Sequence, residues 1–591
     1  MRRFPVSVWL FTLALAAFTS LPYVVGGLSA PQGWQYSGAA AIPNGAQVDY
    51  NSHLAKMWQG RRGQWDYHLL FSHEAHPGLP LVQGFYVALG ALANLTPFSL
   101  PAVYHLARFG LTVGLVLAIW AFAAHYFEKP RERWLATLFG TIVAGWSWLL
   151  LTFDPAMTAE IAPIEFWLSD AFNLLGALVM PHFAAAVIVQ IIIVLTFEAW
   201  VRGSALTPDP FPSSLGGEAA RDRGEMSGFV GDVVYEHKPS SGKKVRTRYI
   251  VSVPAKQLIV LTLALAAQAI IQPYAVLLFG PLLVLLAAYH VFSSHLLTFR
   301  RALCLVIPLG IYAGLVGYQY VALNSDPIWA SFTAQNITLS PPVTYYLLGY
   351  LPFIIPMALG LRAFLLDKAD DRWLVLIIWT ALVAALLYAP FPTQRRYLLG
   401  VQTPLAVMAA YGWSRAVLPR LRARWRPLAT LIYLGVASVA VIGLVVVNIA
   451  ALSQPGTHTA VFYQPDELQA FAWMKRETTG RNDLVLTVAD VSGQGSGGRL
   501  VAAVGQRVYL GHWIETADFA GKVARVQQFY DPTTSDEWRQ QFLRDSGAVY
   551  VWYDGYARQI GAWNPSEAEY LEAVLATETV TIFRVRAEAL P

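Results

Sequence analysis

Apolar segments of about 20 residues recur along this chain from Val6 to Leu452. A water-soluble core does not require apolar runs of that length, whereas a helix that crosses about 30 Å of hydrocarbon does. Hydrophobic residues make up 55% of the 591 positions and charged residues 13%, roughly half the charged share of soluble domains. The sequence therefore predicts a polytopic α-helical membrane protein with about eleven transmembrane helices. The predicted spans are 6–27, 101–127, 134–153, 172–197, 251–271, 275–296, 302–321, 345–364, 373–390, 397–413 and 427–452.

The positions of Lys and Arg predict which loops face the cytoplasm, because loops retained there collect these residues. The basic clusters fall on one side of the predicted spans: 2–3, 129–133, 243–248, 300–301, 362–372 and 415–426. The N-terminus is therefore expected in the cytoplasm, below a prokaryotic-type plasma membrane, and the chain after Leu452 outside it. The net charge of +5 does not indicate a nucleic-acid partner, because the clusters lie in short loops between apolar runs; membrane lipids are the expected neighbours.

This topology divides the chain into a transmembrane domain, which includes an outer loop and a cytoplasmic insertion, and a C-terminal domain. Residues 1–452 are expected to form the transmembrane domain, with a first outer loop at 28–100. Within that loop, 79–95 is apolar but is predicted to be an interfacial or re-entrant helix, because a full span there would move every later basic cluster outside. Residues 203–250 are expected to form a cytoplasmic insertion, with a disordered Pro, Ser and Gly-rich start and a hairpin that turns at 240–242.

The chain from 453 to 591 alternates between helical and extended patterns, which predicts a small soluble α/β domain. The expected helices are 465–478, 516–530 and 535–545, and the expected strands 484–488, 507–510, 549–553 and 579–585. The Gly-rich segment 492–498 lacks the GK[ST] ending of a phosphate loop, so a flexible loop is predicted. In 511–518, Trp513 could bind a sugar, or Thr516 could cap the next helix; both interpretations stay open.

The first outer loop contains a short predicted helix, 48–58, on which Asp49, His53 and Lys56 share one face. A carboxylate near the membrane surface can serve as a general base for an acceptor hydroxyl. Asp49 could equally cap the helix while the other two side chains face solvent.

His73, Glu74 and His76 follow in the same loop and raise the question of a metal site. Their spacing is not HExxH, so an ordinary polar loop is the competing interpretation. Cys304 is the only cysteine, which excludes intramolecular disulfides and thiolate metal clusters. No cofactor is certain from the sequence, and a divalent metal stays open.

Arg395 and Arg396 lie on the predicted outer side, against the charge bias. Guanidinium groups bind phosphate oxygens well, but these two could also reach toward lipid headgroups. Arg108 is a further phosphate-binding candidate that could instead form a structural ion pair. His182, predicted about 12 residues into its span, is either a site residue or a helix-packing histidine.

Further outer polar residues are candidates with weaker support. Asp154, Glu160, Glu165 and Asp170 could include a second acid or a metal ligand, or belong to a solvated loop. Gln272, Tyr274 and Asn324 could line a cavity for lipid or sugar.

The order of motifs in the first outer loop resembles that of the GT-C superfamily of membrane glycosyltransferases. The motifs are an early Asp49 followed by a His-Leu-Ala helix at 53–55, a Gly-x-Trp step at 63–65, a Pro-rich approach at 76–80 and Arg108 at the next span. The resemblance implies a polyprenyl-phosphate sugar donor, Asp49 as catalytic base and inversion at the anomeric carbon. Protein-mannosyltransferase-type relatives commonly have Asp-Glu where this chain has Asp49-Tyr50, which puts the number of catalytic acids in doubt.

The predicted function is transfer of a hexose or pentose from a lipid-linked sugar donor to a glycan, lipid or protein acceptor of the cell envelope. Arg395, Arg396, Arg108, His53, Lys56, Glu74, His73 and His182 are the substrate- or phosphate-binding candidates beside the catalytic Asp49. A transporter or flippase of lipid-linked glycans is the alternative, although the internal repeats typical of transporters are not seen. An inactive envelope scaffold is a third interpretation.

Overall fold

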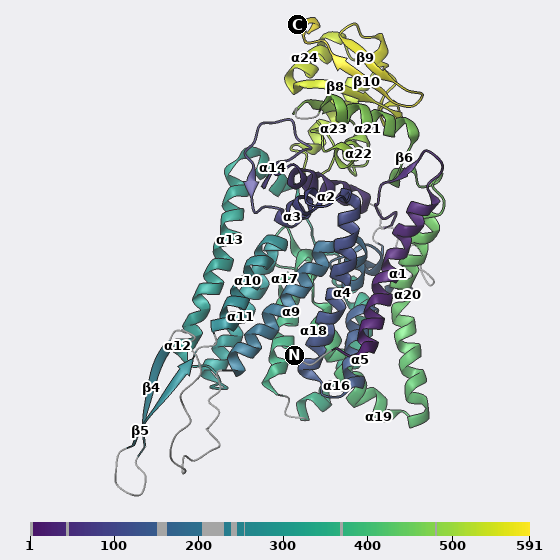
Figure 1. Ribbon diagram of the computed structural model, residues 1–591. Helices are drawn as coiled ribbons and strands as arrows, with labels where there is room; N and C mark the ends of the chain where they lie inside the picture. Colours follow the sequence, from purple (N-terminus) through teal and green to yellow (C-terminus); the bar gives the residue numbers. More distant parts are fainter. Residues whose placement is uncertain are drawn as a thin grey trace.

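The computed structural model describes residues 4–42, 46–149, 162–203, 230–237, 245–252, 255–366, 370–478 and 482–590. Helices form a bundle, and a small sheet with its own helices lies at one end of it (Figure 1). The chain starts at the opposite end, where the hairpin of β4 (Val230–His237) and β5 (Val245–Ser252) also lies. The architecture is therefore a polytopic helical bundle with a small α/β part at one end.

Six described helical stretches are long and apolar enough to cross a membrane. They are α1 (Val6–Ser29), α4 (Leu100–Tyr126), α9 (Pro181–Arg202), η3 with α11 (Pro273–Phe292), α12 to α13 (Phe299–Ser325), and η8 with α20 (Ala423–Leu452). A seventh is a pair, α15 (Val343–Gly349) and α16 (Leu351–Leu366), bent by 75°. Shorter helices fill the remaining predicted spans: α5 (Pro130–Thr141), α10 (Ala255–Ile271), α17 (Leu374–Leu386) and α18 (Gln402–Gly412). The fold class is confirmed, whereas the count of about eleven spans is not.

Two predicted spans differ from the structure. The span 172–197 is split into α8 (Asn173–Val179) and α9, because Pro181 starts a new helix after the extended Met180. His182 therefore lies in the first turn of α9, not deep within a span. The span 134–153 contains helix only to Thr141, and residues 150–161 lie outside the described part.

The first outer loop forms two helices that pack closely, α2 (Ala46–Arg61) and α3 (Gly84–Asn94). The close contact requires glycine: a Cβ on Gly90 would lie 1.9 Å from the carbonyl oxygen of Met57, and one on Gly60 would lie 1.9 Å from that of Val87. The loop also pairs β2 (Asp66–Tyr67) with β3 (Leu79–Pro80). At 11 residues α3 is too short to span hydrocarbon, as the charge pattern predicts.

The C-terminal sheet has the strand order β7, β8, β10, β9 (Leu484–Leu486, Ala548–Tyr553, Thr581–Val585 and Leu571–Ala576). The β7–β8 pair is parallel and the other two pairs are antiparallel. The helices are α21 (Pro465–Glu477), α22 (Ser496–Val504), α23 (Phe519–Tyr530), α24 (Asp536–Ser546) and the short α25 (Gly555–Ile560). The predicted strand 507–510 is wrong, since only Val508 forms a bridge, to Val485, and β9 and α22 were not predicted.

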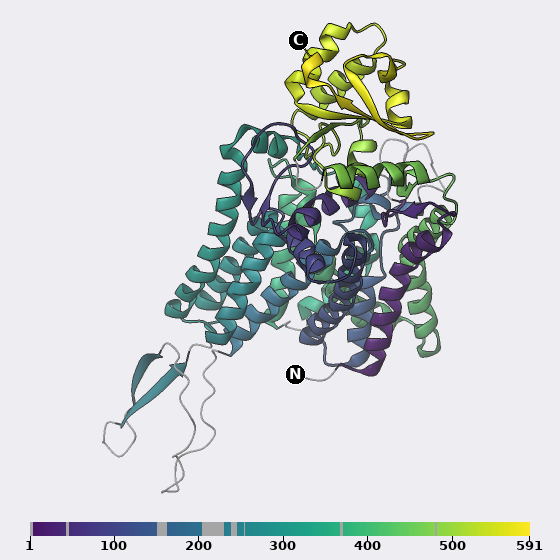
Figure 2. The same cartoon turned by 45° about the horizontal axis from the view of Figure 1, so that its top comes forward.

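The first helix of the bundle lies beside the last one. Helix α1 packs along α20, and β1 (Gln35–Tyr36) pairs with β6 (Phe462–Tyr463). The side chain of Asn448 in α20 accepts hydrogen bonds from the backbone N–H groups of Ala41 and Ile42. These contacts hold the C-terminal part over α2 and α3, as Figure 2 shows.

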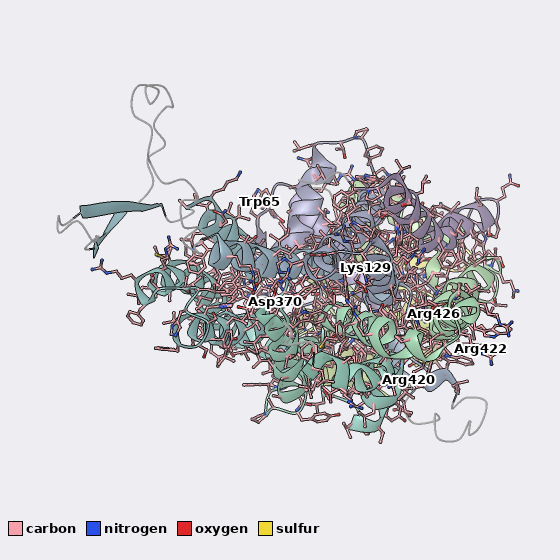
Figure 3. The ribbon with its side chains drawn as sticks, turned by 90° about the horizontal axis from the view of Figure 1, so that it is seen from below. Trp65, Lys129, Asp370, Arg420, Arg422 and Arg426 are labelled. Carbon is pink, nitrogen blue, oxygen red and sulfur yellow. The ribbon has the colours of Figure 1, made fainter. Side chains whose placement is uncertain are left out.

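Several of the basic side chains predicted to face the cytoplasm lie at the other end of the bundle. Figure 3 views the molecule from that end and labels Lys129, Arg420, Arg422 and Arg426 there. The sheet-bearing end and the basic end are therefore opposite faces of the bundle.

Candidate functional site

A cavity of about 150 Å³ opens between the bundle and the C-terminal part, and we call it the upper cavity. Its walls come from α2, the start of α3, the start of α9, the α10–η3 junction, α13, α14 (Pro327–Gln335) and η6 (Gln394–Leu398). A loop of the C-terminal part, residues 512–515, closes it from above. Its polar residues are Asp49, Ser52, His53, Lys56, Gln83, His182, Gln272, Tyr274, Gln319, Asn336, Arg396, His512 and Glu515.

Asp49 lies in the first turn of α2, on the face that looks into the upper cavity. His53 and Lys56 line the same cavity, so the helical spacing predicted their common face. Because α2 begins at Ala46, Asp49 lies inside the helix and is not its cap residue. Its side chain is 42% exposed, and one carboxylate oxygen, Oδ1, lies 3.3 Å from Nε2 of His512. The carboxylate is therefore accessible from the cavity.

Opposing influences act on the pKa of Asp49. Burial raises it, but the hydrogen bond from His512 and the charges of Arg396 and Lys56 outweigh burial, and the pKa lies below its ordinary value. The carboxylate is therefore ionised at neutral pH and able to accept a proton.

Lys56 is neutralised by a carboxylate of the C-terminal part. Its Nζ lies 2.7 Å from Oε1 of Glu515 and 2.6 Å from Oγ of Ser52. Glu515 also accepts hydrogen bonds from Ser52 and Tyr67. Burial raises the pKa of Glu515, but Lys56 and His512 outweigh it and the net shift is downward. Lys56 is thus part of a buried network between α2 and residues 512–515.

Arg396 supplies the cation that faces Asp49 across the upper cavity. It forms a long ion pair, 3.5 Å from Nη1 to Oδ2 of the buried Asp170. Arg395 does not line the cavity as the described residues define it; its guanidinium lies 5.1 Å from the ring centre of Trp167. Burial and the neighbouring Arg396 lower the pKa of Arg395. One carboxylate, Asp170, thus faces two arginines.

Several buried polar atoms around the upper cavity lack a hydrogen-bond partner within the described part of the chain. They are both ring nitrogens of His53, Nε2 of Gln272, Oδ1 of Asn336 and Nε of Arg396. The ring of His53 stacks on Tyr86 at 3.9 Å, and burial holds its pKa well below its ordinary value, so the ring is neutral. Unpartnered buried polar groups are costly, so these five atoms are available to a polar ligand in the cavity.

No family model and no curated protein matches this chain. Solved structures do match. ArnT from Cupriavidus metallidurans bound to undecaprenyl phosphate is 12% identical, with 96% of this chain and 97% of that chain covered and a TM-score of 0.46. The apo state of the same protein is 11% identical, with 99% of both chains covered and a TM-score of 0.48. The oligosaccharyltransferase AglB from Archaeoglobus fulgidus, in complex with an inhibitory peptide and a dolichol-phosphate, is 12% identical. The match covers 98% of this chain and 75% of that chain, with a TM-score of 0.46.

Besides Arg395, three predicted site residues do not line the upper cavity. Arg108 is 1% exposed and bonds to α1, through the carbonyl oxygen of Thr19 and Oγ of Ser20. Its role is therefore to hold α4 against α1. His73 and Glu74 lie together under α23, where Glu74 forms an ion pair with Lys522 at 2.8 Å.

The structure accounts for most of the other candidates. Within the described ranges, no group of three His, Cys, Asp or Glu side chains could hold a metal ion. Glu165 accepts hydrogen bonds from Ser147 and from the backbone of Trp148, and Asn324 bonds within its own helix. Gln272, Tyr274 and His182 line the upper cavity. Asp154 and Glu160 lie outside the described residues.

The sequence did not identify His512 and Glu515 as cavity residues, although it suggested that Trp513, in the same segment, could bind a sugar. Thr516 does not cap the next helix: α23 begins at Phe519, and Oγ1 of Thr516 accepts from the backbone N–H of Gly511. The Gly-rich segment is not a simple loop either, since α22 starts at Ser496. A Cβ on Gly498 would lie 3.2 Å from Asn51, so glycine lets α22 approach α2.

Proposed function

We propose that this protein is a membrane glycosyltransferase that moves a hexose or pentose from a polyprenyl-phosphate carrier to a glycan, lipid or protein acceptor of the cell envelope. One observation carries the proposal: an accessible, ionised carboxylate, Asp49, and a guanidinium, Arg396, line one cavity together with unpartnered polar groups. A lipid-phosphate sugar has the polar head that such a cavity requires.

Asp49 acts as the general base in this reaction. It accepts the proton of an acceptor hydroxyl, whose oxygen forms a bond to the anomeric carbon while the bond from that carbon to the phosphate oxygen breaks. The leaving group is the polyprenyl phosphate, which gains a negative charge. Arg396 stabilises that charge, and Arg395, one residue earlier, adds positive potential.

The unpartnered groups supply the remaining contacts to the donor. His53 is neutral and offers one N–H donor and one acceptor, which suits a sugar hydroxyl or a phosphate oxygen. Gln272 and Asn336 face the same space from the α10–η3 junction and the end of α14. His182 lies near them at the start of α9.

We also propose the orientation of the molecule in the membrane. Residues 1–452 form the transmembrane domain, and 453–591 a soluble domain on the outer face beside the first outer loop. The basic end of the bundle, with the N-terminus, faces the cytoplasm. The upper cavity then opens on the outer side, where a carrier lipid can reach it from the outer leaflet.

The proposal is tested in proteoliposomes with a panel of undecaprenyl-phosphate-linked hexoses and pentoses as donors and an extract of cell-envelope glycans, lipids and proteins as acceptors. Release of undecaprenyl phosphate is measured for the wild type and for Asp49→Asn, with His68→Phe, outside the upper cavity, as the control. We expect turnover by the wild type and the control and none above background by Asp49→Asn. Unchanged turnover in Asp49→Asn would show that Asp49 is not the base. No turnover by the wild type, together with carrier binding that Arg396→Ala abolishes, would favour a flippase or a scaffold.

A further inference from the structure

The hydrogen bond to Asp49 comes from the far end of the chain. His512 lies 463 positions after Asp49 and is 4% exposed, in the loop that closes the upper cavity. Its Nδ1 lies 3.2 Å from the backbone nitrogen of Ile514 and 3.4 Å from that of Glu515. Because Nδ1 accepts from these N–H groups, the ring proton is on Nε2, which faces Asp49.

The loop that carries His512 is fixed to the first outer loop on several sides. Glu515 is held by Lys56, Ser52 and Tyr67. The backbone N–H of Ala517 donates to Oγ of Ser72 at 2.8 Å. Within the loop, the N–H of Thr516 donates to the carbonyl oxygen of His512 at 2.9 Å. The imidazole is thus held in place by contacts that do not involve Asp49.

We infer that His512 is a positioning residue of the C-terminal part: it orients the Asp49 carboxylate, so the catalytic site is incomplete without residues 512–515. This inference rests on the proposed role of Asp49 as base. His512 cannot itself be the base, because Nδ1 is occupied by backbone N–H groups and Nε2 carries the proton directed at Asp49. The second oxygen of Asp49 is left for the acceptor hydroxyl.

The same hydrogen bond favours the charged form of the carboxylate, so its loss changes the pH dependence. Other groups act on Asp49 as well and stay in place when His512 is changed. They are Lys56 of α2, His182 of α9, Arg395 and Arg396 of η6, Tyr86 of α3 and Tyr104 of α4. Two further titratable groups, His53 of α2 and Glu515 of the loop, line the same cavity.

The experiment compares His512→Phe, which removes the donor, with His512→Gln, whose side-chain amide can donate from nearly the same position. Asp49 is titrated without any substrate, by carbodiimide and glycine ethyl ester labelling at a series of pH values, with peptide mass spectrometry as the readout. Carbodiimide modifies the protonated carboxyl group, so labelling appears as the pH falls through the pKa of Asp49. Turnover of the donor panel is measured with the same variants, and His68→Phe is the matched control.

We expect His512→Phe to move the labelling of Asp49 to higher pH and to lower kcat about 10-fold or more at nearly unchanged KM. His512→Gln should restore most of both. Wild-type labelling and kcat in His512→Phe would overturn the inference, as would an effect on KM alone, which would make His512 a substrate contact. If His512→Phe does not fold, His512→Asn, whose amide is one bond shorter, supplies the comparison with His512→Gln.

The proposed function and this inference fail separately. Full turnover in Asp49→Asn removes the base and, with it, the role of His512. Inactive Asp49→Asn beside fully active His512→Phe removes only the inference.

Discussion

Two spaces flank helix α2, and only the smaller one has polar groups without partners. The upper cavity, about 150 Å³, lies along the first half of α2. The second space, about 520 Å³, lies at the end of α2 between the first outer loop and the C-terminal part. We call it the groove; its polar lining includes Gln59, Arg62, His68, His76 and Arg507.

The polar side chains of the groove are largely used within the protein. Gln59 exchanges two hydrogen bonds with the backbone of His68. Arg62 donates to the carbonyl oxygens of Val504 and Gly505. Arg507 donates to three successive carbonyl oxygens, those of Ser72, His73 and Glu74. The groove therefore joins two parts of the chain, whereas the upper cavity retains unused hydrogen-bonding capacity for a ligand.

The largest expected effect concerns Glu515. It lines the upper cavity, but its carboxylate is used within the protein by Lys56, Ser52 and Tyr67, as the polar side chains of the groove are. Glu515→Ala leaves the buried Lys56 without its carboxylate, which should cost about 3–5 kcal/mol of stability. Thermal unfolding in detergent measures the loss. The double variant Lys56→Met, Glu515→Leu should recover much of it, because no lone charge stays buried. A Glu515→Ala protein as stable as the wild type would show that this network does not hold the two parts together.

Arg396 lines the upper cavity and Arg62 lines the groove. Substituting each of them tests whether unused hydrogen-bonding capacity marks the phosphate site. Arg396→Ala should weaken binding of undecaprenyl phosphate about 10- to 100-fold, since a charge-assisted hydrogen bond contributes about 1.5–3 kcal/mol. Arg62→Ala should leave that binding unchanged. Tryptophan fluorescence titration in nanodiscs measures both. Equal losses in the two variants would remove the distinction between the spaces.

Two histidines should give smaller effects that differ in kind, one on stability and the other on turnover. His76 is bonded at both nitrogens, to the backbone of Glu74 and of Leu69, so His76→Phe should cost about 1–2 kcal/mol of stability without affecting the donor. His53 has unpartnered nitrogens, so His53→Phe should leave the stability of the empty protein unchanged while turnover of the donor panel falls about 2- to 10-fold. Thermal unfolding and initial rates distinguish the two patterns. The reverse pattern would contradict the interpretation of the upper cavity.

The smallest effect concerns the clamp between Glu74 and Lys522. Burial raises the pKa of Glu74, but the bonds from His73 and Lys522 prevail and lower it from 4.5 to about 2. A carboxyl group with a depressed pKa stabilises the fold above its unfolded pKa, and the contribution is lost as the pH falls through the folded value. The melting temperature should therefore decline between pH 4.5 and about 2. Glu74→Gln should flatten this decline, and an unchanged slope would show that other carboxyl groups cause it.

Local patterns in the sequence predicted the half of the site that lies on one helix. Asp49, His53 and Lys56 share a face because of the helical repeat, which depends only on residues a few positions apart. Arg396 was found because it broke the charge rule for outer loops. His512 could not be found in this way, because its partner lies 463 positions away and no periodicity links them.

The fold shows the same division between local and distant information. Hydropathy located the helical segments but not the break at Pro181, because the apolar run continues through it. Likewise, Arg108 is typical of a binding residue when read alone. Its partners Thr19 and Ser20 belong to a helix whose packing the sequence does not reveal.

The junction of α2 with residues 512–515 also has a consequence for biogenesis. Ribosomes release the N-terminal segments first, so α2 is made while most of the bundle is still missing. Its partner loop emerges 463 residues later. In the orientation that we propose, α2 therefore crosses the membrane before its partner exists, and the wall of the upper cavity is completed only when residues 512–515 fold against it.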